Sequence, residues 1–333
     1  MGCRIIPVFL LCAVATFCFA EDQIDDNTPF VFLIPFGYGF FQSGDQTIHK
    51  PALGAGFLYG EQDLPFDEVT RRFLGIALYQ PMFSKQEPLS GVPKLLHQID
   101  FLMDGRINRH QLLLIFKSAA DNPVAGGFST FQAGAGWGYE MIRQPSFSLI
   151  IGGALAVGDF GLELPSGSPL PLLPVPLIRF GVNTRWFVSS FDFLTGPNIE
   201  FTIAPKEQFR FTADMRMDNY RSINDLICEF TFWYRLFDNN HRFGDFAGVG
   251  LGFKNQSYEF ALSSMETSFA LQQTSIFAVA DVSLLKIEAG WIFNSRHLLD
   301  GKEFRPMNNS LGGGFYLSIQ GIIPISIKSY NRR

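Results

Sequence analysis

The sequence is poor in charge, nearly free of cysteine after its first twenty residues, and without a long apolar run beyond them. Only 17% of its 333 residues are charged, below the roughly 25% usual for a soluble domain. Cys228 is the one cysteine after residue 20, so we expect no disulfide in the chain that follows. No apolar run there reaches the ~18 residues of a membrane-spanning helix, so a helical membrane protein is not expected. The formal net charge of −5 argues against nucleic acid as a partner.

The N-terminus has the pattern of a secretory signal peptide. One basic residue precedes an apolar block, and Cys18-Phe19-Ala20 supplies a small-x-Ala cleavage site before an acidic stretch. The apolar block is shorter than the ~20 residues of a membrane anchor. The expected segments are a cleaved signal peptide at 1–20, a short acidic leader at 21–29, a β-sheet domain at 30–327 and a basic tail at 328–333.

Alternation of apolar and polar residues is the main signal in the rest of the chain. In QFRFTADMRMD, which covers 208–218, every odd position is apolar and every even position is polar. A period of two residues is that of a β-strand with one apolar and one polar face. Glycine, proline and asparagine interrupt the pattern at intervals, which indicates turns. The predicted strands are 30–41, 52–60, 71–84, 95–104, 107–118, 128–142, 146–158, 175–191, 198–204, 208–217, 223–237, 245–262, 267–281, 284–294 and 311–327.

The alternation fits two kinds of β protein, because a soluble sandwich buries its apolar row whereas a membrane barrel turns that row toward lipid. Several predicted strands have the ~9 to 11 residues that a tilted strand needs to cross a bilayer. Glycine occurs inside strands, as in FQAGAGWGY at 131–139, and aromatic residues bracket many strands. These features favour the barrel.

In these features residues 30–327 resemble the porin-like β-barrel proteins of bacterial outer membranes. The resemblance implies an all-β fold, a single antiparallel transmembrane β-barrel in the bacterial outer membrane. It also implies contact with the lipid bilayer and insertion by the barrel-assembly machinery. A soluble secreted β-sheet protein that binds a ligand is the alternative.

The number of strands follows from parity. Fifteen strands are predicted above, but a single-chain bacterial barrel has an even number. With fifteen strands, the long loop at 295–310 falls at the periplasmic end of the barrel, where short turns are expected. Removing one crossing between 257 and 284 corrects this, so we expect about 14 strands, with 12 as the next choice.

Charged residues on the polar rows are the candidate functional residues, because these rows face the lumen of a barrel. Opposite charges balance there, which favours ion pairs between neighbouring strands, and the alternative is a pore constriction that uses the arginines of 208–218 opposite Glu200 and Glu229. The candidate lumen-lining residues are Arg179, Arg185, Glu200, Arg210, Asp214, Arg216, Glu229, Arg235, Lys286 and Glu288.

The sequence gives little support for catalysis. Its five histidines are far apart and lack metal-ligand spacing, so we expect no catalytic residues, metal site or cofactor. His110 and Ser118 match no catalytic motif. We expect a channel for small solutes or a structural barrel of the envelope. An outer-membrane carrier of hydrophobic ligands is the alternative, with the apolar, proline-rich loop 164–176 as its gate.

Overall fold

A computed structural model describes most of the chain after residue 29. The described residues are 30–43, 46–60, 71–85, 92–123, 130–158, 172–193, 197–220, 223–241, 244–262, 267–282, 284–299, 302–303 and 313–326. The predicted signal peptide, acidic leader and basic tail lie outside them. Among the described residues, no helix is long and apolar enough to cross a membrane.

The described residues form one sheet of β-strands. Its elements are β1 (Phe30–Ser43), β2 (Gln46–Gly60), β3 (Arg71–Tyr79), β4 (Met82–Ser84), β5 (Leu95–Ile107), β6 (His110–Ala120), β7 (Phe131–Gln144), β8 (Phe147–Gly158), β9 (Leu172–Asn183), β10 (Phe187–Phe193), β11 (Pro197–Ile203), β12 (Phe209–Tyr220), β13 (Ile223–His241), β14 (Gly244–Leu262), β15 (Thr267–Val282), β16 (Leu285–Leu299), β17 (Lys302–Glu303) and β18 (Gly314–Ser326).

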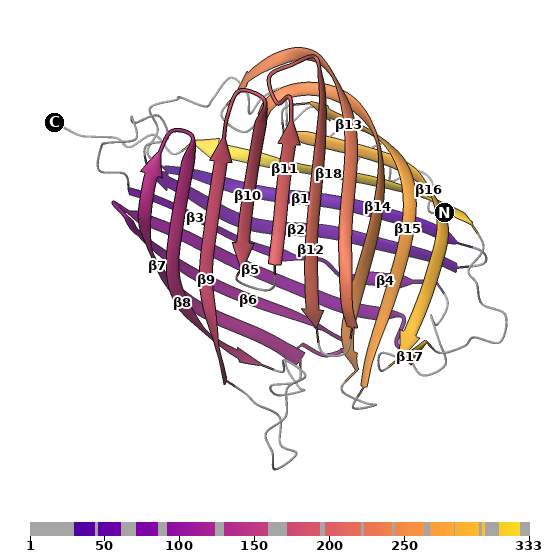
Figure 1. The fold of residues 1–333 in the computed structure, drawn as a ribbon. Helices are drawn as coiled ribbons and strands as arrows, with labels where there is room; N and C mark the ends of the chain where they lie inside the picture. The colour runs from indigo at the N-terminus through magenta and orange to yellow at the C-terminus, as the bar shows by residue number, and fades with distance from the viewer. Residues whose placement is uncertain are drawn as a thin grey trace.

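The sheet closes into an antiparallel barrel (Figure 1). Each strand pairs with the next along the chain, and β18 pairs with β1 from Val31↔Ser326 to Ser43↔Gly314. Because β4 continues β3 and β17 is a two-residue extension beside β16, the described residues make 16 crossings. Closure leaves no open sheet edge along most of the wall, which is what a strand structure needs in lipid.

The expected number of 14 strands is therefore wrong, and the error has two sources. The predicted strand 175–191 is two strands, β9 and β10, because Thr184-Arg185-Trp186 makes a turn between them. The crossing that parity removed between 257 and 284 exists, because β14 and β15 pair along their length from Gly248↔Asp281 to Leu262↔Thr267. The barrel does have an even number of strands, but that number comes from one strand more than the fifteen predicted and not from one fewer.

With 16 crossings the connections sort into two ends of the barrel. We call the end where β1 meets β2 the loop end, because the long connections 85–94, 121–130, 159–171 and 300–313 also lie there. The opposite, turn end has the short connections 108–109, 145–146, 184–186, 204–208 and 242–243, together with the ten-residue connection 61–70. The connection after β16 thus joins the other long ones without removing a strand.

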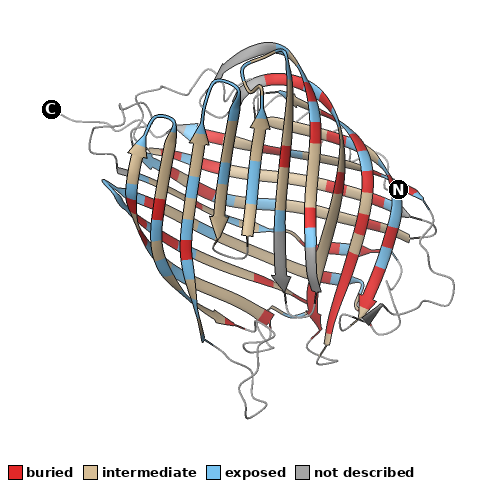
Figure 2. Cartoon of the chain, viewed as in Figure 1, coloured by how far each residue is buried: buried red, intermediate tan, exposed pale blue. Residues whose placement is uncertain are grey.

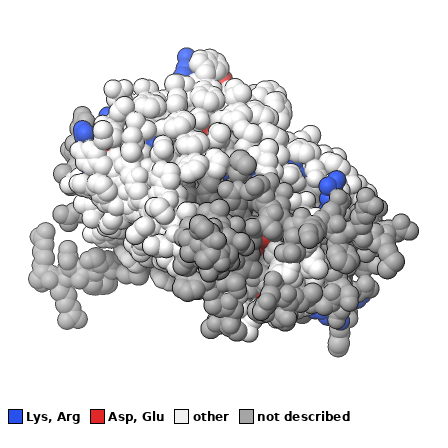
Figure 3. Space-filling model, turned by 60° about the horizontal axis from the view of Figure 1, so that its bottom comes forward, with Lys and Arg blue, Asp and Glu red and all other residues white. Residues whose placement is uncertain are grey.

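The outer face of the barrel is apolar. On β13, Leu226, Phe232 and Leu236 are each more than half exposed, whereas Thr231 and Trp233 between them are buried. Register carries this row onto β14, where Leu251 is 69% exposed. Buried and exposed residues alternate along many strands (Figure 2), and the described surface in Figure 3 shows few charges. An apolar face of this size fits lipid and not water, which contradicts the soluble alternative.

An apolar cluster extends through the lumen from the loop end along β13 to β16, and we call it the apolar cap. The tip of the β14–β15 hairpin folds across the barrel there, so that Ala261 pairs with Ala120 of β6 and accepts a hydrogen bond from Asp121 N (2.9 Å). Buried residues accordingly gather on the right side of Figure 2. The cap consists of Phe41, Ile48, Met82, Val92, Leu96, Trp233, Phe260, Leu262, Phe269, Leu271, Phe277, Val279, Ile292 and Tyr316.

The C-terminal part of the predicted loop 164–176 is wrong, because it belongs to strand β9. Residues 172–176 pair with β8, from Val157↔Leu172 to Gly153↔Pro176, while residues 164–171 lie outside the described residues. Pro174 and Pro176 do not break this strand, because β10 starts to pair only from Ile178 onward. Proline is tolerated in a strand where the side that its nitrogen faces has no partner.

Candidate functional site in the barrel lumen

A row of three carboxylates crosses the inner wall between β11 and β13. Glu200 pairs with Asp214, and Asp214 pairs with Glu229. Side chains directly opposite one another in an antiparallel pair lie close together, so like charges there repel. The pattern did not predict this, because it placed arginines opposite the two glutamates. Arg216, two residues beyond Asp214 on β12, instead pairs with Asn198 and Ile227.

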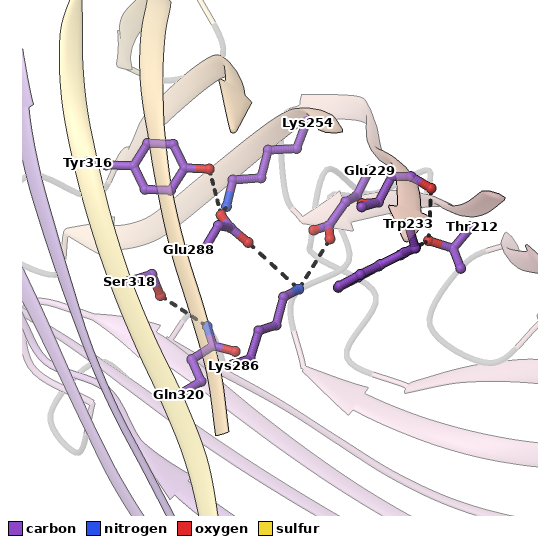
Figure 4. Close-up of polar contacts among 10 residues, drawn as sticks. Thr212, Glu229, Trp233, Lys254, Lys286, Glu288, Tyr316, Ser318 and Gln320 are labelled. Carbon is purple, nitrogen blue, oxygen red and sulfur yellow. Dashed lines mark hydrogen bonds and ion pairs between the residues drawn. The ribbon is translucent and has the colours of Figure 1, made fainter. Parts of the chain in front are cut away.

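Lys254 of β14 follows the carboxylate row and begins a buried ion-pair cluster (Figure 4). Its ammonium group pairs with the carboxylate of Glu288 on β16. The hydroxyl of Tyr316 on β18 donates to Glu288 Oε1 (2.5 Å), and Lys286 Nζ lies 3.7 Å from Glu288 Oε2 and 3.3 Å from Glu229 Oε1. Glu288 is 4% exposed, so its charge depends on these partners.

Aromatic rings surround the same lysine. Lys254 Nζ lies 4.4 Å from the centre of the Tyr316 ring and 5.2 Å from that of Phe277. Space for these side chains comes from Gly252 and Gly290, because a Cβ at Gly252 would lie 2.4 Å from the Phe277 ring, and one at Gly290 2.5 Å from the Tyr316 ring. Glycine inside these strands therefore makes room for bulky inner side chains.

A second ion-pair cluster lies on the wall between β5 and β10. Arg179 Nη1 contacts Asp104 Oδ2 on β5 (2.9 Å), and its Nε contacts Asp192 Oδ2 on β10 (2.5 Å). Gln111 donates to Asp104 Oδ1 (2.7 Å). The contact with Asp104 spans β6, β7 and β8, whose inner positions include glycines such as Gly138. The small residues of this wall leave the arginine room to cross it.

The structure places most of the predicted lumen residues on inward rows. Inward rows are identified by register with buried Thr231 and Trp233 of β13. Arg185 is the exception, because it lies in the exposed turn between β9 and β10 with its guanidinium 5.1 Å from the centre of the Trp186 ring. The other nine are Arg179, Glu200, Arg210, Asp214, Arg216, Glu229, Arg235, Lys286 and Glu288.

Part of the lumen is open to water. Ser190, Glu200 and Arg216 stand on the inward rows of β10, β11 and β12, and all three are exposed. An inward side chain is accessible only where the barrel encloses free space. The wall from β10 to β12 therefore faces a cavity, whereas the apolar cap fills the lumen on the side of β14 to β16.

A further cavity of about 380 Å³ lies beside β1 and β18. Gly37 and Gly39 leave this space open, and Lys50, Lys254 and Lys286 are among the residues around it. Lys50 Nζ sits 4.0 Å from the centre of the Tyr258 ring. Lys254 and Lys286 contact carboxylates, and the carboxylate of Asp281 also lines this cavity.

Sequence reasoning overlooked several residues of these clusters. Tyr316 shares its face with Ser318 and Gln320, so the strand period was the signal that could have placed it in the lumen. Nothing in the pattern showed that it would contact Glu288. Asp104 was predicted as the last residue of the strand 95–104, whereas β5 continues through Gly105 to Ile107. Alternation over the whole strand was the signal that could have found Asp104.

The described residues contain no candidate metal site, and they keep His110 apart from Ser118. They include no group of three or more His, Cys, Asp or Glu that could hold a metal ion. His110 lies at the turn end of β6, where its ring contacts those of Trp137 and Tyr139. Ser118 lies near the other end of β6 and donates to the carbonyl oxygen of Thr130 (2.8 Å). The two residues therefore do not meet.

No protein-family model and no curated protein matches this chain. Solved structures that match include OccAB3 of Acinetobacter baumannii, with 9% identity over 90% of this chain and 100% of that one and a TM-score of 0.37. OprD of Pseudomonas aeruginosa matches at 10% identity over 92% of this chain and 95% of that one, with a TM-score of 0.37. OpdQ of Pseudomonas aeruginosa matches at 10% identity, over 91% and 99%, with a TM-score of 0.34. The chain thus resembles outer-membrane channels in structure.

Proposed function

We propose that the protein is an outer-membrane channel that passes small polar solutes through the lumen of its barrel. The observation that carries the proposal is the exposure of Glu200 and Arg216, which stand on inward rows of a closed barrel. Water must reach these charges from inside. A barrel whose only task was structural would be expected to fill its lumen, as the apolar cap does on the opposite wall.

The apolar cap limits the size of the solute. The tip of the β14–β15 hairpin reaches β6 across the loop end, so the free path is narrower than the barrel itself. We infer that solutes pass along the wall from β5 to β12, between the Arg179 cluster and the carboxylate row. Because residues of both charge signs line this path, we expect it to pass polar solutes without a strong preference for cations or anions.

The proposal includes the location of the protein and its orientation. The apolar outer face supports a membrane position with the lipid bilayer as its surroundings. Outer-membrane barrels have short turns on the periplasmic side and longer loops outside, so the loop end would face the exterior. Export through a cleaved signal peptide at 1–20 and insertion by the barrel-assembly machinery belong to the same proposal.

Single-channel conductance in planar bilayers tests the proposal. The protein would be refolded in detergent, with a heat-dependent shift in gel mobility as the control for folding. We expect discrete current steps whose size rises with salt concentration. A folded barrel that inserts without conducting would overturn the channel and favour a structural barrel of the envelope.

A charge variant tests the path. Glu200→Gln removes an accessible carboxylate from the lumen, so the reversal potential in a KCl gradient should move toward chloride preference. Glu207→Gln is the matched control, because Glu207 lies in the turn 204–208 outside the strands. Equal shifts from both variants would contradict the assignment of Glu200 to the path.

A further inference from the structure

The described strands leave a gap in the wall of the barrel at the loop end between β9 and β12. The β10–β11 hairpin that separates these strands is short, with Phe187–Phe193 and Pro197–Ile203, and Figure 1 shows it ending well before its neighbours. Among the described residues, 172–177 of β9 pair only with β8, and 217–220 of β12 pair only with β13. Three strand spacings separate β9 from β12, so the gap is about 14 Å between backbones.

The β9 edge of the gap lacks most of the hydrogen-bond donors of an ordinary strand edge. Asn183 N donates to the carbonyl oxygen of Ser146, so odd-numbered residues of β9 direct their N–H groups toward β8. The pairing of β8 with β9 has no register shift, so even-numbered residues direct theirs toward the gap. Two of the three even residues there, Pro174 and Pro176, have no N–H. An open edge in lipid is costly because its donors lack partners, and proline lowers that cost and blocks pairing with another strand.

Side chains around the gap are apolar on both faces of β9. Leu172, Pro174 and Pro176 are exposed on the outer face, and Leu173, Val175 and Leu177 alternate with them on the inner face. Polar residues are usual on the inner face of a channel barrel, and the neighbouring inner positions of β10 to β12 follow that rule.

The apolar lining continues inward from the gap. Leu113 and Ile150 pack against Leu177 in one buried cluster, with Ile115 beside it. Ala154 pairs with Val175 and Ala156 pairs with Leu173, so the inner wall next to the gap carries small apolar side chains. The Arg179 cluster lies beyond this apolar stretch, nearer the turn end.

We propose that this gap is a lateral entrance through which solutes with an alkyl chain move between the bilayer and the lumen. The proposal rests on the membrane barrel of the proposed function and extends its solutes to amphipathic ones. The alkyl chain would cross the donor-poor edge of β9 and lie on the apolar wall of β6 to β9. A polar head group would remain in the wetted part of the lumen along β10 to β12.

Quenching of tryptophan fluorescence by brominated acyl chains tests the entrance. The four native tryptophans are Trp137, Trp186, Trp233 and Trp291. Three proteins with a single tryptophan would be refolded into vesicles of phosphatidylcholine brominated in its acyl chains. The first retains Trp137, which is 49% exposed on the outer face, and the second retains Trp233, which is buried on the inner face away from the gap. The third carries Val175→Trp alone, with phenylalanine at the four native positions.

We expect Val175→Trp to lose at least half as much fluorescence as the Trp137 protein, although residue 175 faces inward. Quenching no stronger than that of the Trp233 protein would overturn the entrance. If Val175→Trp fails the gel-mobility test for folding, Val175→Cys in a Cys228→Ser background replaces it. This variant is exposed to a maleimide attached to the acyl chain of a lipid in the vesicles. Thr212→Cys is the control for an inward residue away from the gap. Reaction at position 175 that exceeds reaction at position 212 supports the entrance, and reaction no greater than at position 212 refutes it.

Conductance measured on the same preparations separates this proposal from the proposed function. Current steps without quenching at residue 175 would leave a channel for polar solutes and no lateral entrance. Quenching without current steps would leave the entrance and overturn the open channel, as for a carrier of hydrophobic ligands.

Discussion

Replacement of Lys254 by methionine should destabilise the barrel strongly, because it removes the closest partner of a buried carboxylate. Glu288 is 4% exposed, and after the change its remaining partners are the Tyr316 hydroxyl and Lys286 Nζ at 3.7 Å. Removing one member of a buried ion pair costs about 3–5 kcal/mol. Since Lys286 compensates in part and methionine retains packing on the Tyr316 and Phe277 rings, we expect a loss of about 3 kcal/mol in the free energy of unfolding.

Urea unfolding of the protein in detergent micelles, followed by tryptophan fluorescence, measures this loss. Lys254→Met combined with Glu288→Leu should recover most of it, because replacing both members of a buried pair with apolar residues is often close to neutral. Lys286→Met is the matched control, with a side chain 32% exposed, and should cost about 1 kcal/mol or less. A single variant as stable as the Lys286 control, or a double variant no more stable than Lys254→Met, would refute the reasoning.

Three further changes have expected outcomes. Tyr316→Phe removes a hydrogen bond to a charged group and should cost about 2 kcal/mol in the same urea assay, while an unchanged unfolding midpoint would contradict a role for its hydroxyl. Phe260→Ala empties part of the apolar cap, so it should lower stability by about 3 kcal/mol and increase single-channel conductance, and a lower conductance would count against the cap as the narrowing element. Pro174→Thr with Pro176→Thr restores two donors to the open edge of β9 and should produce dimers that cross-link in vesicles, whereas a purely monomeric double variant would show that this edge is protected by other means.

The strand period predicted the fold class, because it records which residues share a face. In 210–216 the even residues face the lumen as the alternation requires, whereas Gln208 lies in the turn before β12 and donates to the hydroxyl of the outward-facing Tyr234. Most candidate lumen residues lie on inward rows. The period does not count strands, since a tight turn such as 184–186 can interrupt a run of apolar residues without a glycine or proline to mark it.

Contacts within the lumen could not be predicted from the strands alone. Arg179 meets Asp104 across three intervening strands, and the β14–β15 tip meets β6 on the far wall. Both contacts depend on the curvature and cross-section of the closed barrel. A local pattern contains neither quantity, because a barrel's shape follows from strand number and register together.

Pairing of the first strand with the last has a consequence for the order of biogenesis. β1 can complete its ladder only with β18, which is synthesised at the end of the chain. Loop closure between such distant segments is slow, because chain entropy is lost before the strands form the hydrogen bonds that stabilise them. Synthesis must therefore have passed β18 before the seam can close, and a product truncated before Gly314 would keep two unpaired edges available to other strands.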